Sequence, residues 1–300
     1  MASLRDIRRR IRGIRSTAQI TKAMELVAAS RMRRAQQRVL SARPYSDAMR
    51  TFMSQLGAAG SGDAQHPLLV QRPVDTAGIL VMTSDRGLCG ALNANVLRRS
   101  NQLLVQETTE ERHDVELITV GRKGQDFMAR YVAGKGKKLL GTFTQLGDRP
   151  DYDAIIPIAR VVMDSYLAGV MDVCYIVYPK FVSTLVQRPE VIKLLPIEPA
   201  ADGSGAGGGR PVDYIYEPNP DAILETLLPR YVEVQIFQAI IETIASEQSA
   251  RMVAMRNANE NAKDLINNLT LTYNKARQAS ITTEVLEIAA AAEFMAQQSR

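Results

Sequence analysis

The sequence predicts an α+α/β fold: a long antiparallel coiled coil of the N- and C-terminal helices, with an inserted small doubly wound α/β domain. Three observations predict it. Apolar residues repeat at heptad spacing from Leu4 to Ala42. Neither Pro nor Gly occurs from Tyr231 to Gln298. Between these segments, short β-type apolar runs alternate with helical stretches. The expected domains are a long N-terminal helix at 1–57, an inserted α/β domain at 74–200, a flexible loop at 201–220, and a long C-terminal helix at 221–300.

The first helix is predicted from positions spaced alternately by three and four, of which all but Thr21 and Glu25 are apolar. We expect Pro44 to interrupt it, with helical composition resuming to about Leu56. The stripe consists of Leu4, Ile7, Ile11, Ile14, Ala18, Thr21, Glu25, Ala28, Met32, Ala35, Val39 and Ala42.

The last helix carries a matching stripe, which slips at Gln248 and Arg251. Because two long terminal helices with facing stripes bury them most simply on each other, we expect an antiparallel pair. We expect a kink or a helix start at Pro229. The stripe runs through Phe237, Ile241 and Ile244, and then through Met255, Ala258, Ala262, Leu265, Leu269, Ala276, Ala279, Leu286 and Ala290.

The middle of the chain changes from helical periodicity to strands alternating with helices, which predicts a largely parallel sheet. A low-complexity, glycine-rich stretch at 201–211 then predicts a flexible loop. The expected strands are 78–84, 115–120 and 173–179, with a possible edge strand at 191–197, and the expected helices lie near 90–106, 122–133 and 153–168.

The charge is unevenly distributed. The chain carries +5 overall, but residues 1–43 hold twelve Lys or Arg against Asp6 and Glu25, so this segment is +10 and the rest is −5. Such a segment needs a solvated face or a negative partner, which could be nucleic acid, anionic lipid or an acidic protein surface. No apolar run approaches the roughly 20 residues needed to span a bilayer, so we expect any membrane attachment to go through partners.

Residues for catalysis are scarce. His66 and His113 are the two histidines, and the sequence has no HExxH, paired Cys/His cluster or nucleophile elbow. Cys89 and Cys174 are expected to be reduced, buried thiols. We therefore expect no catalytic residue, metal or cofactor, and no enzymatic activity in the chain itself.

Two glycine patterns imitate phosphate-binding loops. Gly203, Gly205 and Gly208 satisfy GxGxxG, but no strand feeds that loop and no helix opens from it. The stretch 84–92 does lie between a predicted strand and helix, where backbone amides could meet an anion. It lacks the GxxxxGK[ST] spacing, so its glycines are interpreted as tight-turn residues.

The C-terminal stretch 285–296 is apolar or small on nearly every side, broken by Glu287 and Glu293. A helix that is apolar all round must be enclosed. The pattern favours a sleeve made by other subunits, with a helix tip packed on its own domain as the alternative.

Four blocks, ITKAMELVAASRMRRAQ (20–36), SDRGLCGALN (84–93), SEQSARMVAMRNANENA (246–262) and YNKARQASITTEVLEI (273–288), resemble the γ subunits of bacterial F-type ATP synthases. They occur in order and span essentially the whole chain. The resemblance implies a central rotor shaft without an active site, which transmits rotation of a membrane-embedded c-ring to the catalytic β subunits. The alternative is a basic coiled-coil scaffold that binds nucleic acid or a membrane surface, against which the 5% aromatic content counts.

The resemblance also implies partners, location and contact residues. One copy would stand inside a ring of three α and three β subunits and rest with an ε subunit on the c-ring, peripherally on the cytoplasmic side of the inner membrane. Met24 should face an acidic lever loop of β, and Arg277 with Gln278 should form a polar catch for another β loop. The implied ring contacts are Lys22, Met24, Arg31, Arg33, Arg34, Arg251, Arg277, Gln278, Thr282, Glu284 and Glu287, and the implied c-ring contacts are Tyr214, Tyr216 and Glu217.

Overall fold

The computed structural model describes residues 3–59, 66–134, 139–197 and 220–298. It divides into two compact units, one formed by Met1–Val27 with Met252–Arg300 and the other by Ala28–Arg251. The helices are α1 (Leu4–Ala59), α2 (Leu92–Val105), α3 (Arg122–Gly134), α4 (Ile156–Leu167) and α5 (Pro220–Gln298), with a π-helical turn η1 (Gln106–Glu110) and a 3₁₀ turn η2 (Tyr152–Ala154). The strands are β1 (Thr76–Met82), β2 (Asp114–Val120), β3 (Gly141–Phe143), β4 (Val173–Phe181) and β5 (Gln187–Leu195).

The larger unit contains a five-stranded sheet of order β3-β2-β1-β4-β5. The first four strands are parallel, and β5 joins the edge antiparallel to β4. Because β2 and β3 lie on one side of β1 while β4 lies on the other, the sheet is doubly wound, as predicted. The short strand β3 was not predicted, since its three residues leave no periodicity to read.

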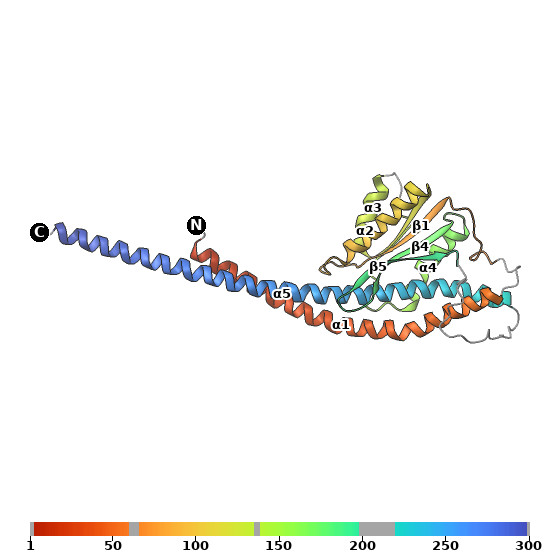
Figure 1. The fold of residues 1–300 in the computed structure, drawn as a ribbon, viewed down its shortest axis with the longest axis horizontal. Helices are drawn as coiled ribbons and strands as arrows, with labels where there is room; N and C mark the ends of the chain where they lie inside the picture. Colours follow the sequence, from red (N-terminus) through yellow and green to blue (C-terminus); the bar gives the residue numbers. More distant parts are fainter. Residues whose placement is uncertain (1–2, 60–65, 135–138, 198–219, 299–300) are drawn as a thin grey trace. The chain divides into compact units, whose positions relative to one another are not determined.

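Helices cover both faces of this sheet (Figure 1). On one face, α2 and α3 pack on β1 and β2 through residues such as Val96, Leu104 and Met128. On the other face, α4 and the first part of α5 pack through residues such as Val162 and Ile236. Both faces are therefore buried, which explains why the strands read as continuous apolar runs.

In the larger unit, α1 packs on α5 through a third apolar cluster that contains Val39, Phe181, Ile241 and Ala245. The expected interruption at Pro44 is wrong, because α1 continues through it to Ala59. Proline removes one backbone hydrogen bond, but Val39 and Met49 are buried on either side of it, 1% and 7% exposed. Packing on both flanks therefore holds the helix together.

The smaller unit pairs the first part of α1 with the last part of α5. Arg8 stacks over the ring of Tyr273, and Arg256 bonds to Glu25. Since α1 ascends from 8 to 25 while α5 descends from 273 to 256, the two segments are antiparallel, as predicted. All members of the predicted α1 stripe are buried or half-buried in their respective units.

The C-terminal helix does not start at Pro229. It begins at Pro220 and contains Pro229 within its length. Leu224, Leu228 and Val232 are buried against the sheet on both sides of that proline. The apolar contacts on each side of the proline sustain the helix, although proline disfavours helix interiors.

Candidate functional site

Two predicted contact residues, Lys22 and Met24, lie on α1 in the smaller unit. The Lys22 ammonium is largely exposed and donates a hydrogen bond to the Glu25 carboxylate at 3.0 Å. Met24 is half-buried, so part of its side chain faces outward. Both positions are therefore accessible on this unit, although Lys22 already has an intramolecular partner.

Three further predicted residues, Arg31, Arg33 and Arg34, lie on α1 in the larger unit. Arg33 and Arg34 are exposed, whereas Arg31 forms an ion pair with Asp148. A cleft of about 280 Å³ is lined by Arg31, Arg34, Ala35, Arg38, Asp148 and Arg149. Four arginines against one aspartate make this cleft electropositive, which suits an acidic partner.

The predicted polar catch lies on α5 in the smaller unit, where Arg277, Gln278, Thr282, Glu284 and Glu287 are all exposed. Their hydrogen bonds are local to the helix: Thr282 Oγ1 donates to the Gln278 carbonyl at 2.9 Å, and Glu284 accepts from Ser280 at 3.2 Å. The functional ends of Arg277 and Gln278 thus face outward on one helical segment.

The same end of α5 exposes apolar side chains. Every described residue from 281 to 292 is exposed, and four large ones stand out: Ile281 at 50%, Val285 at 58%, Leu286 at 63% and Ile288 at 70%. Soluble chains rarely leave such a contiguous surface uncovered unless it meets a partner. Residues 281–292 of the smaller unit therefore form an exposed apolar surface of the kind that a partner covers.

Arg251 differs from the other predicted contacts because it is only 9% exposed. Its guanidinium donates to Glu247 Oε1 at 2.6 Å and to the carbonyl of Gly87 at 3.1 Å. Within this chain, Arg251 therefore serves an internal contact between α5 and the loop after β1. Tyr214, Tyr216 and Glu217, the expected c-ring contacts, lie outside the described residues.

The loop after β1, whose glycines were interpreted as tight-turn residues, directs two of its own side chains to backbone amides. Asp85 accepts hydrogen bonds from the backbone amides of Arg122 and Gln145, both at 3.0 Å. Thr83 Oγ1 accepts from the amide of Gly124 at 2.7 Å. The amides of Arg122 and Gly124 open α3, where related folds bind phosphate, whereas the amide of Gln145 lies in the segment after β3. A carboxylate and a hydroxyl thus take the place of a ligand.

The glycine at the end of β2 permits this close approach. Gly121 has φ +93°, and a Cβ there would lie 2.1 Å from the carbonyl oxygen of Thr83. Only glycine tolerates both conditions. The tight-turn interpretation of the loop after β1 holds for Gly90, which has φ +58°.

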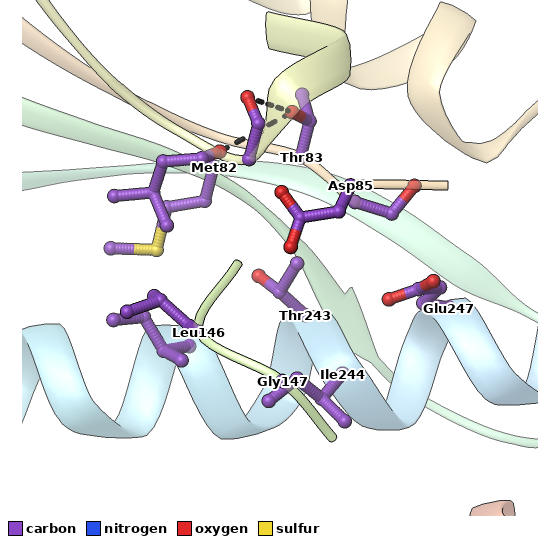
Figure 2. A pocket seen from close by; sticks show the side chains of 12 residues that line it. Met82, Thr83, Asp85, Leu146, Gly147, Thr243, Ile244 and Glu247 are labelled. Carbon is purple, nitrogen blue, oxygen red and sulfur yellow. Dashed lines mark hydrogen bonds between the residues drawn. The ribbon is translucent and has the colours of Figure 1, made fainter. Parts of the chain in front are cut away.

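Asp85 also lines a cavity of about 40 Å³ between the sheet and α5 (Figure 2). Thr243 and Glu247 of α5 line the same cavity. This volume holds no more than one or a few waters. Burial raises the pKa of the Glu247 carboxyl, and the Arg251 charge and hydrogen bond oppose that rise. This cavity is therefore too small for a nucleotide. Asp85 and Glu247 also line an open cleft of about 720 Å³.

The ion pairs of Glu25 and of Glu247 were not predicted. Glu25 pairs with Lys22 and Arg256 in the smaller unit, and Glu247 pairs with Arg251 in the larger unit. The signal was present in both cases, because polar residues interrupt the apolar stripes at these places. A charged residue buried between packed helices needs an oppositely charged or hydrogen-bonding partner, which periodicity alone does not identify.

Comparisons with known proteins agree with this architecture. Residues 3–295 match the protein family described as ATP synthase. The chain is similar to the ATP synthase gamma chain of Roseiflexus castenholzii, with 49% identity over 99% of this chain and 100% of the relative. It is also similar to the ATP synthase gamma chain of Dehalococcoides mccartyi, with 48% identity over 99% and 100%.

Solved structures share the fold at lower identity. A chain of the mitochondrial ATP synthase of Euglena gracilis, from the OSCP/F1/c-ring assembly in rotational state 3, aligns with a TM-score of 0.69. The alignment covers 99% of this chain and 96% of that chain at 20% identity. This likeness supports the fold.

Proposed function

The chain belongs to the family of bacterial ATP synthase gamma chains, and we propose that it works as a shaft that passes c-ring rotation to the β-subunit catalytic sites. As a gamma chain it is a non-catalytic subunit of the central stalk, and the catalytic sites are in the β subunits.

One observation carries the proposal: the outward-facing apolar end of α5. Leu286 and Ile288 are 63% and 70% exposed, and they lie beyond Tyr273, over whose ring Arg8 of α1 stacks. Enclosing these side chains removes apolar surface from water, at about 25 cal/mol per Å². A ring of three α and three β subunits would provide that enclosure.

The polar residues nearby suit a rotor that must release each contact. Hydrogen bonds exposed to water contribute about 1 kcal/mol each, so they form and break at each step. Arg277 and Gln278 would grip a β loop at particular rotation angles, and Thr282, Glu284 and Glu287 would contact the ring in the same region. Met24 would face an acidic lever loop of β. Lys22, Arg31, Arg33 and Arg34 would supply positive charge, and the arginine-lined cleft that contains Arg31 and Arg34 supports an acidic partner.

The complex is membrane-associated, and we infer that this chain joins it through an ε subunit and the c-ring on the cytoplasmic side of the inner membrane. None of the helices in the described ranges has the length and apolar character needed to cross a bilayer. Contact with the c-ring by Tyr214, Tyr216 and Glu217 is part of the proposal.

Reconstitution tests the function. The purified chain is mixed with α and β subunits, and complex mass and MgATP hydrolysis are measured. A complex of three α, three β and one copy of this chain, hydrolysing faster than α and β alone, is the expected result. Absence of a complex under conditions in which an established gamma chain assembles would refute the proposal.

A further inference from the structure

Polar side chains of α5 hold the loops at one end of the sheet. Gln248 donates to Asp148 at 3.1 Å, Ser249 donates to the carbonyl of Thr184 at 2.7 Å, and Arg251 donates to the carbonyl of Gly87 at 3.1 Å. These residues are buried, although two of them interrupt the apolar stripe of the helix. Each one reaches a different loop of the α/β domain.

Of these three side chains of α5, only Arg251 is charged. Its side chain and that of Glu247 are 10% and 13% exposed, and they pair at 2.6 Å. A charge-assisted bond in a buried setting is stronger than a neutral one. Removing either partner alone leaves a buried charge unpaired, whereas replacing both with apolar groups can be nearly neutral.

The loop that Arg251 grips has an unusual conformation. Leu88 has φ +63°, in the left-handed region that disfavours non-glycine residues, and its side chain is 63% exposed. The next residue, Cys89, is only 2% exposed, and its sulfur accepts a hydrogen bond from Asn93 at 3.3 Å. A strained backbone of this kind persists only where surrounding contacts hold it.

We propose that Arg251 is a positioning residue: with Glu247 as its counter-ion, it holds the Gly87 carbonyl and so keeps Leu88 facing outward as a contact for the catalytic ring. We call the Glu247–Arg251 ion pair, together with the hydrogen bond from Arg251 to the Gly87 carbonyl, the latch. All of its contacts lie within this chain. The role of Leu88 as a contact rests on the proposed shaft function.

The two cysteines allow the latch to be measured directly. Cys89 lies in the gripped loop, while Cys174 is fully buried in the sheet, where burial raises its thiol pKa to about 12. In the full-length chain, Arg251→Met should speed labelling of Cys89 by DTNB roughly 10- to 100-fold, because loss of a charge-assisted bond lets the loop open. Cys174 should label at the wild-type rate. Unchanged labelling of Cys89 would overturn the latch.

A double variant separates positioning from stability. Glu247→Met with Arg251→Met removes the unpaired buried carboxylate but cannot bond the Gly87 carbonyl. We expect Cys174 to stay protected and Cys89 to remain fast. Return of Cys89 to the wild-type rate would mean that the loop needs only a stable domain, and the latch would be wrong. Ser249→Ala, which releases a different loop, is the matched control and should leave Cys89 labelling within about twofold.

The contact role of Leu88 is tested in the complex with α and β subunits. Leu88→Ser and the double methionine variant should each reduce the stimulation of MgATP hydrolysis, and combining them should add little, because both remove the same contact. If Cys89 responds as expected but both complexes hydrolyse at the wild-type rate, the latch stands and the Leu88 contact is refuted. Failure of the wild-type chain to assemble would instead refute the shaft function.

Discussion

At the residue scale, Glu25 shows how one charged side chain is accommodated between two packed helices. It is 7% exposed, and it accepts hydrogen bonds from Lys22 at 3.0 Å and from Arg256 at 3.4 Å. The hydrogen bond from Lys22 is the largest cause that lowers the pKa of Glu25. A lowered pKa means that the ionised carboxylate is stabilised in the folded chain.

The sign of this shift gives a pH prediction. The stabilisation by Glu25 is present above pH 4.5, its ordinary pKa, and is lost as pH falls through the lower folded value. Glu25→Gln should therefore lower Tm near pH 7, and the difference from wild type should shrink below pH 4.5. Thermal unfolding followed by circular dichroism across this range measures it. Glu287→Gln, at an exposed position, should follow the wild type throughout, and a constant Tm difference for Glu25→Gln would contradict the linkage.

Met24 carries a second prediction at this scale. Met24→Lys adds a cation that would pair with an acidic lever of β and delay its release. One additional ion pair contributes up to about 1 kcal/mol, so proton-driven ATP synthesis should fall roughly fivefold. Met24→Leu conserves volume without adding charge and should retain wild-type synthesis. Equal synthesis rates in both variants would show that Met24 is not at the lever.

At the element scale, the start of α3 depends on a cap supplied by another loop. Asp85 satisfies the amide of Arg122, the first residue of the helix, and its negative charge complements the helix dipole. The same carboxylate also holds the amide of Gln145 in the segment after β3. One side chain therefore fastens two elements of the domain.

Removing that cap should cost about 1 to 2 kcal/mol, because Asp85→Ala leaves two amides without their partner. The free energy of unfolding from urea titration measures the cost. Asp126→Ala, on the exposed face of the same helix, is the control and should change stability by less than about 0.5 kcal/mol. Equal losses in the two variants would contradict the capping role.

At the scale of the whole molecule, substitutions at the exposed end of α5 should change assembly with α and β subunits but not the stability of the isolated chain. Leu286→Ser with Ile288→Ser should leave the unfolding of the isolated chain unchanged, since both side chains already face water. Assembly with α and β should weaken at least tenfold, because the enclosed apolar area is lost. Native mass measurement of a subunit titration tests this, with Asn268→Ser as the control. Wild-type assembly by the double variant would refute enclosure of this segment.

Elements marked by long apolar patterns in the sequence could be predicted, whereas the shortest strand could not. The two terminal helices and the strands β1, β2 and β4 were predicted because long periodic or continuous apolar runs reflect repeated burial. β3 and the continuation of α1 through Pro44 were not. Both depend on packing against segments distant in the sequence, which overrides local propensity.

The features of the candidate site also fall into some that the sequence predicted and others that it did not. The family and the apolar character of the C-terminal end could be predicted from the sequence, because composition and motif order carry that information. The pairing of Arg251 with Glu247 and the Gly87 carbonyl, and the capping of α3 by Asp85, could be seen only in the folded chain. The physical reason is that a buried polar group must find its partner in three dimensions, and sequence spacing does not specify that partner.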